Sequence, residues 1–527
     1  MRLLIADGLS SEAISRMKAI EGLEILDFKD IPRAELKELI PTVDILIVRS
    51  RTQIDKDLLH GARNLKLAIR AGIGLDNVDV AAATEQGVVV MNAPTGNIVT
   101  TAEHAIALLF AVSRHIARAD ASMRAGKWDK KSFQGSEIRG KTLGVLGLGN
   151  IGKAVAERAV GLKMHVLGYD PYLSEEAAAK YGVRLASLDE VLAKSDYLTI
   201  HVPLLDSTRG LIGKEAFSKV KKGAYLINCA RGGIVDETAM IEALDAKILK
   251  GAALDVFETE PLPADHPLLK RNDVVLTPHL GASTEEAQYQ VGLEVAEQVA
   301  EYVASGALKN AINVPNVSLD EMESLRPHLT LCEKLGAFAA QAVPHQNVKR
   351  ICVHYEALAP GLRKEVLTLS VLQGFLSSLL GTPVNNVTAR KTLKERGIVL
   401  EESVQDGCGD YASLVRLTVE GAQTLTVAGT LFGRGEPRIV QVDRFAIDGI
   451  LNGSLLFTKN IDTPGVIGAM GSTLGAEGIN IARMHLGRGE EQGDAIALVS
   501  VDSDLSPELL GAMRNIPGMT SVVQVRL

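Results

Sequence analysis

The sequence predicts an α/β protein with two doubly wound parallel-sheet domains, followed by an α+β domain and a ferredoxin-like domain. Three observations support this prediction. Short apolar segments alternate with helical patterns over residues 1–290, which is typical of parallel sheets covered by helices. A strand, a glycine-rich turn and a helix follow one another from residue 142. Residues 453–527 show the order strand, helix, strand, strand, helix, strand, which is the ferredoxin-like order.

The first sheet is predicted from four apolar segments, at residues 2–6, 44–48, 65–69 and 88–91. Ligands bind such a sheet in the crevice at the carboxyl ends of its strands. The loops expected there contain Arg49 and Ser50, Gly74, and Asn97. Arginine binds carboxylate or phosphate through paired hydrogen bonds, and exposed backbone N–H groups at glycine bind an oxyanion. Taken alone, Arg49 is better explained as a surface arginine at a strand end.

Residues 98–125 contain few helix-breaking residues, so we predict one long helix that crosses from the first domain to the second. The residues that follow, 142–152, have the spacing G-x-G-x-x-G between a predicted strand and a predicted helix. Gly147 permits the tight turn, Gly149 lets a pyrophosphate approach the backbone, and Gly152 lets helix and strand pack closely. The amino end of the helix supplies partial positive charge to the phosphates. This segment therefore predicts dinucleotide binding.

The next predicted strand ends at Asp170. A carboxylate there accepts hydrogen bonds from a ribose diol and repels a 2′-phosphate. Pro171 and Tyr172 follow it, and no arginine does. The cofactor is therefore predicted to be NAD rather than NADP.

Polar residues follow three later predicted strands, which end near Asn228, Asp255 and Leu276. The carboxyl ends of parallel strands meet at one edge, so these residues can converge. His279 would take a hydroxyl proton, Glu260 would orient its ring, and Arg231 would bind a substrate carboxylate or carbonyl. Asp255 could accept a hydrogen bond from a nicotinamide amide. Taken alone, His279 is equally well explained as a structural histidine, and the alternative for Glu260 is a solvated loop acid. Together, and beside a dinucleotide motif, these residues are better explained as catalytic.

The helical pattern over residues 284–304 would return the chain to the first domain. We therefore predict four domains: a substrate-binding domain of residues 1–97 and 288–316, an inserted NAD-binding domain of the Rossmann type (98–287), an intervening domain (317–452) and a C-terminal domain (453–527). In the intervening domain, helices are expected at 329–343 and 370–380 and strands at 348–355, 413–420 and 423–432. No motif with chemistry lies in that domain.

Composition limits the classes of function. The chain has 527 residues, a net charge of −8, 46% hydrophobic and 23% charged residues, and no long run of one charge. This argues against a general nucleic-acid binder. The longest apolar stretch is too short to span a membrane. Four scattered cysteines, at 229, 332, 352 and 408, form no C-x-x-C pair. They indicate neither a metal site nor a disulfide framework, and they suit the reducing cytoplasm.

The segments V-L-G-L-G-N-I-G, N-C-A-R-G-G-I-V-D, A-L-D-V-F-E-T-E-P and P-H-L-G-A-S resemble the D-isomer-specific 2-hydroxyacid dehydrogenase family over residues 1–316. V-R-S-R-T, R-A-G-I-G-L-D-N-V-D and A-P-T-G-N narrow the resemblance to the branch that acts on D-3-phosphoglycerate at the entry to serine synthesis. The resemblance implies Arg231, Glu260 and His279 as the catalytic set. The implied substrate contacts are Arg49, Ser50, Asn97 and Gln288. The implied NAD contacts include Asn150, Ile151, Asp170, Cys229, Ala230, Asp255, Gly281 and Ala282.

Residues 453–527 resemble the ACT regulatory domain at Asn460, Asp462 and Asn480. The resemblance implies that these polar residues hold an amino-acid effector, such as L-serine, between paired domains. Asn460 and Asp462 stand where some serine-regulated relatives have His and Asn. The alternative is a purely structural module for oligomerisation, since a fold by itself assigns no function.

Two other functions stay open from the sequence. One is a reductase of another 2-oxo acid, such as glyoxylate, hydroxypyruvate or 2-oxoglutarate, which would use the same three catalytic residues. The other is an amino-acid-sensing regulator that keeps the dehydrogenase body as a scaffold. The family resemblance also implies a homo-oligomer, expected to be a tetramer.

Overall fold

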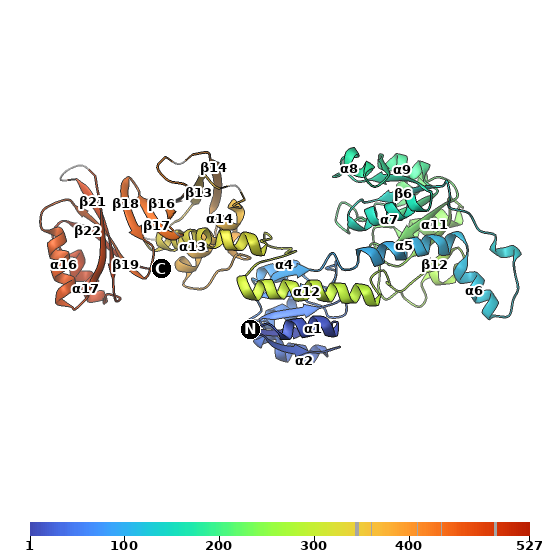
Figure 1. The fold of residues 1–527 in the computed structure, drawn as a ribbon, viewed down its shortest axis with the longest axis horizontal. Helices are drawn as coiled ribbons and strands as arrows, with labels where there is room; N and C mark the ends of the chain where they lie inside the picture. The colour runs from blue at the N-terminus through green and yellow to red at the C-terminus, as the bar shows by residue number, and fades with distance from the viewer. Residues whose placement is uncertain (343–346, 360, 408, 434, 490–492) are drawn as a thin grey trace.

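The computed structural model describes residues 1–342, 347–359, 361–407, 409–433, 435–489 and 493–527. Figure 1 shows an elongated molecule. The domain that contains the G-x-G-x-x-G turn lies at one end, and the sheet nearest the C-terminus lies at the other. Two parallel sheets come first in the chain, and two sheets with antiparallel pairs follow. The predicted fold class is therefore confirmed.

The first sheet has five parallel strands in the order β2-β1-β3-β4-β5. The strands are β1 (Arg2–Ile5), β2 (Glu24–Asp27), β3 (Ile45–Val48), β4 (Leu67–Arg70) and β5 (Val89–Asn92). Helices α1 (Ser11–Lys18), α2 (Arg33–Leu39), α3 (Lys56–Gly61) and α4 (Val80–Glu85) connect them. Strand β2 was not predicted, because none of the residues of this edge strand is buried and it lacks the continuous apolar pattern of the other strands.

The second sheet has seven parallel strands in the order β12-β11-β10-β9-β6-β7-β8. These are β6 (Thr142–Leu146), β7 (His165–Tyr169), β8 (Val183–Leu185), β9 (Tyr197–Ile200), β10 (Ala224–Asn228), β11 (Leu249–Leu254) and β12 (Val274–Leu276). The main helices on its faces are α7 (Asn150–Gly161), α9 (Leu188–Lys194) and α11 (Glu237–Asp245), with shorter α8 (Glu175–Ala179) and α10 (Lys214–Lys219). The strand order reverses between β6 and β9, which is where such sheets bind ligands.

The prediction of one helix over residues 98–125 is wrong. The chain forms α5 (Ile98–Ser113) and α6 (Ile116–Arg124), separated by His115 in a left-handed conformation with φ 55°. Ser113, the last residue of α5, is buried and its hydroxyl bonds to the Leu109 carbonyl and contacts the Tyr197 hydroxyl. No residue of α6 is buried, and Figure 1 shows α6 extending away from the sheet. Helical periodicity could not reveal this break.

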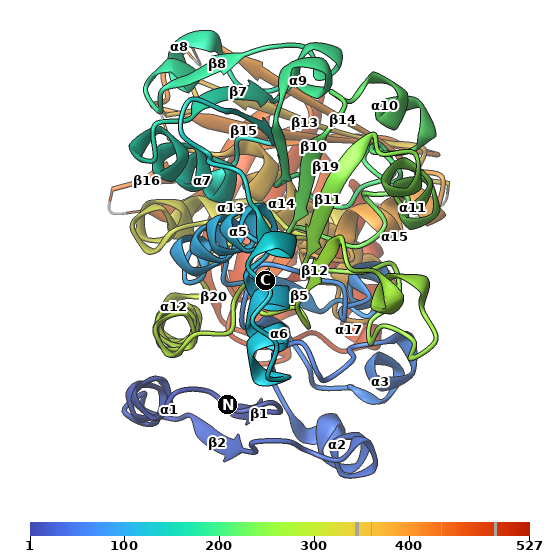
Figure 2. The ribbon, with the colours of Figure 1, turned by 90° about the vertical axis from the view of Figure 1, so that its right-hand side faces the viewer.

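Two helices connect the first two domains. Helix α5 packs its apolar side into the second domain, against α7. Helix α12 (Glu285–Ser305) packs on α1, and Val291 and Val295 share a core with Leu3 and Ile5. Figure 2 shows both helices between the first domain below and the second domain above. The second domain is therefore inserted between two parts of the first.

The third sheet has six strands in the order β14-β13-β15-β16-β17-β18. They are β13 (Arg350–Glu356), β14 (Val399–Gln405), β15 (Leu414–Glu420), β16 (Thr424–Phe432), β17 (Glu436–Val442) and β18 (Phe445–Ile450). The helices are α13 (Leu319–Ala342), α14 (Lys364–Leu380) and α15 (Ala389–Glu395). Helices α13 and α14 start earlier than predicted, and three strands were missed. Val343, the predicted end of the first helix, and Cys408 lie outside the described residues.

The fourth sheet has the order β20-β21-β19-β22, with antiparallel neighbours. Its strands are β19 (Ser454–Ile461), β20 (Ile481–Arg488), β21 (Asp494–Val501) and β22 (Met519–Arg526), and its helices are α16 (Val466–Ala476) and α17 (Pro507–Arg514). The predicted ferredoxin-like order is confirmed. Phe457 of β19 contacts Phe338 of α13, with ring centroids 5.5 Å apart, so the third and fourth sheets share one hydrophobic core.

Among the described residues, no helix is long and apolar enough to cross a membrane. Within the same residues, no cluster of His, Cys, Asp and Glu could hold a metal ion.

Candidate active site between the two parallel-sheet domains

A cleft of about 1230 Å³ lies between the first two domains. We call it the interdomain cleft. The first domain contributes Arg49, Ser50, Asn97 and Gln288, and the second contributes Glu260, His279 and Ala282. Each of these residues was predicted from sequence to lie at a site. The cleft therefore brings together residues that are more than 200 positions apart in the chain.

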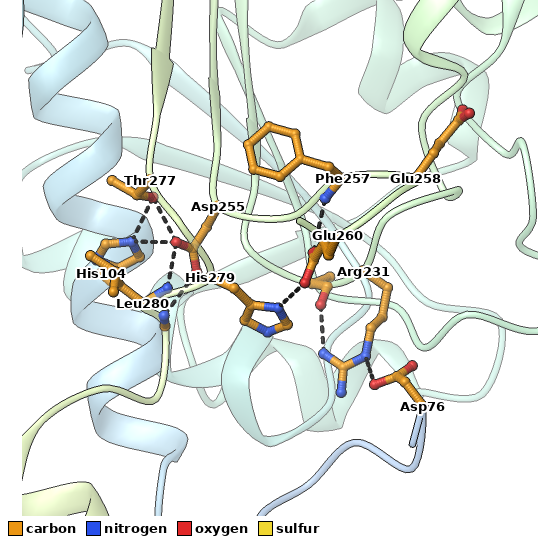
Figure 3. A network of polar contacts seen from close by, with 12 residues as sticks. Asp76, His104, Arg231, Asp255, Phe257, Glu258, Glu260, Thr277, His279 and Leu280 are labelled. Atoms are coloured by element: carbon orange, nitrogen blue, oxygen red, sulfur yellow. Dashed lines mark hydrogen bonds and ion pairs between the residues drawn. The ribbon is translucent and has the colours of Figure 1, made fainter. Parts of the chain in front are cut away.

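His279 and Glu260 form a hydrogen-bonded pair in this cleft. Nδ1 of His279 lies 2.7 Å from Oε2 of Glu260, and the other oxygen of Glu260 accepts a hydrogen bond from the Phe257 N–H at 3.0 Å (Figure 3). His279 has a left-handed backbone with φ 55°, and its N–H bonds to the Asp255 carbonyl at 2.9 Å. Both ends of the pair are thus fixed by backbone contacts.

The pair shifts the pKa of each partner toward the charged form. The hydrogen bond that His279 donates to Glu260 raises the pKa of His279, and this outweighs the opposing effects of burial and of Arg231. Burial raises the pKa of Glu260, but the hydrogen bonds from His279 and Phe257 outweigh it and hold that pKa below its usual value. Because Glu260 is a carboxylate, Nδ1 of His279 must carry the proton, which leaves Nε2 as the base when the ring is neutral.

Asp255 holds the loop that carries His279. Its buried carboxylate accepts hydrogen bonds from the Thr277 hydroxyl at 2.6 Å and from the N–H groups of Leu280 and Gly281 at 2.7 and 2.8 Å. His104 on α5 lies 3.2 Å from the same carboxylate. Burial raises the pKa of Asp255, but these bonds hold it below the usual value. A nicotinamide amide that donates the expected hydrogen bond would therefore compete for a carboxylate that already has four partners.

Arg231 reaches from the second domain toward the first. Its Nε lies 3.0 Å from a carboxylate oxygen of Asp76, and Nη1 donates to the Ala230 carbonyl at 2.6 Å (Figure 3). A Cβ on Gly74 would lie 2.0 Å from Nη2 of Arg231. Any side chain at position 74 would therefore displace the guanidinium of Arg231, which lies directly against the backbone.

Arg70 was not among the residues predicted for the site. It ends β4 and lines the cleft, and its Nε is buried without a hydrogen-bond partner among the described residues. Burial and the neighbouring Arg231 lower its pKa to about 10, so it stays charged near neutral pH. Lys29 and Arg51 also line the cleft. An anionic ligand fits this concentration of positive charge.

Backbone contacts fix the loops that bear the other predicted substrate residues. Glu294 of α12 accepts hydrogen bonds from the N–H groups of Thr95 and Gly96, at 3.1 and 3.2 Å, and so holds the loop before Asn97. Asn97 is buried, and its Oδ1 has no partner among the described residues. The sequence contains no signal for the role of Glu294, because an acid on a helix is usually solvated.

The glycine turn has a geometry that suits a dinucleotide. Gly147 has φ 91°, and a Cβ there would lie 2.8 Å from the His201 carbonyl group. A Cβ on Gly152 would lie 2.0 Å from the Gly147 oxygen, whereas no atom lies within 4 Å of a Cβ built on Gly149. The open side at Gly149 leaves room for a pyrophosphate beside the amino end of α7, where Asn150 and Ile151 lie.

Asp170 and Cys229, which are predicted to lie at the ribose and nicotinamide ends of NAD, are both held in place by their own chain. Asp170 accepts hydrogen bonds from the N–H groups of Leu148 and Tyr172, both at 2.9 Å, which fixes its carboxylate above the glycine turn. Cys229 is buried, and burial raises the pKa of its thiol, so it stays neutral and packs as an apolar wall beside Ala230. The residues present therefore fit NAD.

The three predicted effector residues do not meet within one chain. Asn460 lies near the end of β19, opposite Ala495 at the start of β21. Asp462 follows β19, and its N–H bonds to the carbonyl of Gly493, the residue before β21. Asn480 precedes β20, and its carbonyl accepts from the Asp502 N–H beyond the far end of β21. At about 3.4 Å per residue, roughly 25 Å of strand separates the two positions. One ferredoxin-like unit alone cannot close this site.

The predicted effector residues already have partners in their own chain. Arg488 of β20 forms an ion pair with Asp462. Asn480 donates to the Asp502 carboxylate at 2.9 Å, and Asn460 donates to the Ile461 carbonyl at 2.9 Å. A ligand at these residues would have to replace these contacts.

Comparison with family models identifies two regions of the chain. Residues 106–281 match the D-isomer specific 2-hydroxyacid dehydrogenase, NAD binding domain. Residues 324–443 match the D-3-phosphoglycerate dehydrogenase intervening domain.

Whole-chain comparisons agree with these matches. The chain is 41% identical to a D-3-phosphoglycerate dehydrogenase of Archaeoglobus fulgidus, over 100% of both chains. It is 40% identical to the enzyme of the same name from Bacillus subtilis, over 100% of this chain and 99% of that one. Among solved structures, an NAD-dependent formate dehydrogenase from Staphylococcus aureus in complex with NAD is 30% identical, with a TM-score of 0.54, and the match covers 60% of this chain and 100% of that one.

Proposed function

This chain belongs to the D-3-phosphoglycerate dehydrogenases, which are NAD-dependent oxidoreductases of the D-isomer-specific 2-hydroxyacid dehydrogenase family, and on this premise we propose that it oxidises D-3-phosphoglycerate to 3-phosphohydroxypyruvate, the first step of L-serine synthesis. The observation that carries the proposal is the His279–Glu260 pair facing a cleft with several cations. A substrate with a carboxylate at one end and a phosphate at the other matches that charge.

His279 acts as the acid and base. Its Nε2 takes the proton of the substrate hydroxyl while the hydrogen on the same carbon leaves as hydride. Bound NAD supplies the nicotinamide ring that accepts this hydride. Glu260 keeps the imidazole in the tautomer with the proton on Nδ1 and stabilises the imidazolium that forms. In the reverse direction, the same imidazolium returns the proton to the carbonyl oxygen.

Arg231 binds the substrate carboxylate and polarises the carbonyl that develops beside it, since a guanidinium donates paired hydrogen bonds. Arg49 binds the phosphate, with Ser50 and the loop of Asn97 beside it. Gln288 of α12 lines the same side of the cleft. The phosphate and the carboxylate are thus bound by cations from different domains.

The glycine turn and the start of α7 would hold the pyrophosphate of NAD through Gly147, Gly149, Asn150, Ile151 and Gly152. Asp170 would bind the adenine ribose. Cys229, Ala230 and Ala282 would form the wall against the nicotinamide end. Asp255 would act there mainly through Gly281 and His279, whose positions its carboxylate and carbonyl fix.

A substrate panel tests this proposal directly. Initial rates of NADH formation would be measured with D-3-phosphoglycerate and with unphosphorylated 2-hydroxy acids at equal concentration. Preference for the phosphorylated acid supports the proposal. Activity on unphosphorylated acids alone would move the assignment to a reductase of another 2-oxo acid such as glyoxylate, hydroxypyruvate or 2-oxoglutarate. No turnover with any acid would favour a regulator built on a dehydrogenase scaffold.

We also propose that the C-terminal domain binds L-serine between two chains, with Asn460 and Asp462 from one and Asn480 from the other. The wide separation of these residues within one sheet supports a site shared by paired domains. Such pairing requires a homo-oligomer, which we expect to be a tetramer in the cytoplasm. The exposed Trp128, beyond the uncovered helix α6, supports a further contact between copies. A mass measurement that finds a monomer would contradict both proposals.

A further inference from the structure

Two consecutive side chains contact both parts of the substrate site. Asp76 and Asn77 follow β4, in the loop that also contains Gly74. Asp76 lies 3.0 Å from Arg231 of the second domain. Asn77 donates from Nδ2 to the carbonyl of Arg49 at 2.7 Å and to that of Thr52 at 2.6 Å. This dipeptide therefore connects the arginine assigned to the carboxylate with the arginine assigned to the phosphate.

The contact with Asp76 fixes the orientation of Arg231. Asp76 meets Nε, the Ala230 carbonyl accepts from Nη1, and the backbone at Gly74 lies against Nη2. Contacts on three sides leave the outer N–H groups of the guanidinium for a carboxylate. Because Asp76 and Arg231 belong to different domains, this ion pair joins the two domains across the substrate site.

The contact with Asn77 fixes the loop of Arg49. Asn77 is buried, and both of its amide hydrogens are used on that loop. On the other side, Asp7 accepts from the Arg49 N–H at 2.7 Å and from the Thr52 hydroxyl at 2.6 Å. The loop is thus held between two side chains, so the backbone of Arg49 has a fixed position relative to Asp76.

We propose that Asp76 and Asn77 set the distance between the carboxylate-binding Arg231 and the phosphate-binding Arg49, and thereby select the length of the substrate. The inference rests on the proposed function, which assigns those two arginines to the two ends of the substrate. Asp76 and Asn77 are positioning residues, because they act through the arginines. A carboxylate and a phosphate bind together only when both arginines stand at the right separation.

Two substitutions separate the two ends. In Asp76→Asn the Michaelis constant for D-3-phosphoglycerate should rise about tenfold, because Arg231 loses a charged partner. Competitive inhibition by D-glycerate, which has only the carboxylate end, should weaken by a similar factor, and inhibition by inorganic phosphate should not change. Asn77→Ala should have the reverse effect. Inhibition by inorganic phosphate should weaken, and inhibition by D-glycerate should not change. The turnover number should fall much less than the Michaelis constant rises, and Asp76→Glu should partly restore binding.

Glu12→Gln is the matched control, since Glu12 forms one exposed ion pair with Arg16 in the same domain and should leave every constant unchanged. NADH affinity and the melting temperature show whether each variant is folded. If Asn77→Ala does not fold, the Asp76→Asn result alone decides whether the inference holds. An unchanged or lower Michaelis constant in Asp76→Asn overturns the inference. A lower value would mean that Asp76 competes with the substrate for Arg231. Failure of the unaltered enzyme to oxidise D-3-phosphoglycerate would instead refute the proposed function.

Discussion

Sequence motifs predict a site both in the interdomain cleft and in the C-terminal domain, but the fold places the residues of the two motifs differently. In the cleft, Arg49, Glu260 and His279 come from distant parts of the chain and line one cavity. In the C-terminal domain, Asp462 and Asn480 are only 18 positions apart in sequence, yet they lie at opposite ends of one sheet. A motif therefore indicates a site only when the topology brings its residues together.

The difference follows from strand direction. All strands of the first two sheets are parallel, so residues after successive strands gather at one edge. In the fourth sheet, the residues after β19 and those before β20 occupy opposite ends of β21, which runs between these strands. We infer that the cleft is complete in one chain, whereas an effector site needs a second chain. Four experiments test this contrast.

The largest effect is expected for His279→Ala. Losing the base should lower turnover about 1000-fold, within the usual range for general acid–base groups. NADH affinity, measured by fluorescence titration, should stay within about twofold because His279 lies outside the glycine turn. His354→Ala is the control, because His354 is bonded to Ser403 on the third sheet, away from the cleft. Turnover that survives His279→Ala would remove the basis for placing the chemistry in the cleft.

The next largest effect is expected for Arg231→Lys. Lysine keeps the charge but loses the paired donors, so kcat/KM for D-3-phosphoglycerate should fall about 100-fold. Steady-state kinetics with varied substrate would measure this. Arg16→Lys, on α1, should have no effect. Equal kinetics for Arg231→Lys and the unaltered enzyme would show that only charge matters at this position.

A smaller effect is expected for Glu260→Gln, and it depends on pH. Neutral His279 is the base, so the rate of oxidation should fall as pH falls through the pKa of His279. Glu260 raises that pKa above its ordinary value of 6.5. The glutamine variant should therefore lose rate by about tenfold and shift the acid limb of its kcat/KM profile to lower pH. A shift toward higher pH would contradict the assigned roles.

The smallest effect is expected in the C-terminal domain. L-serine should lower the rate of the unaltered enzyme, and Asp462→Ala should weaken this response. Arg488→Ala should strengthen it a few-fold, because the exposed ion pair with Asp462 is worth about 1 kcal/mol or less and competes with the ammonium group of serine. Serine titrations of the initial rate would measure both variants. If no variant alters the response, or serine has none, the domain is structural or binds another effector.

The sequence located chemistry that depends on short segments. The G-x-G-x-x-G turn, Asp170 and the strand-end residues are local patterns, and parallel topology makes their convergence predictable. The residues that support the site were not predictable in this way. Arg70 and Asp76 lie 161 and 155 positions before Arg231, with which both interact. His104 lies 151 positions before its partner Asp255, and Glu294 lies more than 190 positions after its partner Thr95. Each looks like an ordinary surface charge until the chain is folded.

The sequence by itself determined the fold class, the turn that suits NAD and the three residues assigned to catalysis, because periodicity, glycine spacing and strand ends depend on near neighbours. Only the tertiary structure decided where α5 ends, that Asp255 holds the His279 loop, and that the residues proposed to bind an effector are separated. These outcomes depend on strand pairing and on buried polar contacts between distant segments. A polar group that leaves water must find a partner, and which partner it finds is fixed by the packing of the whole chain.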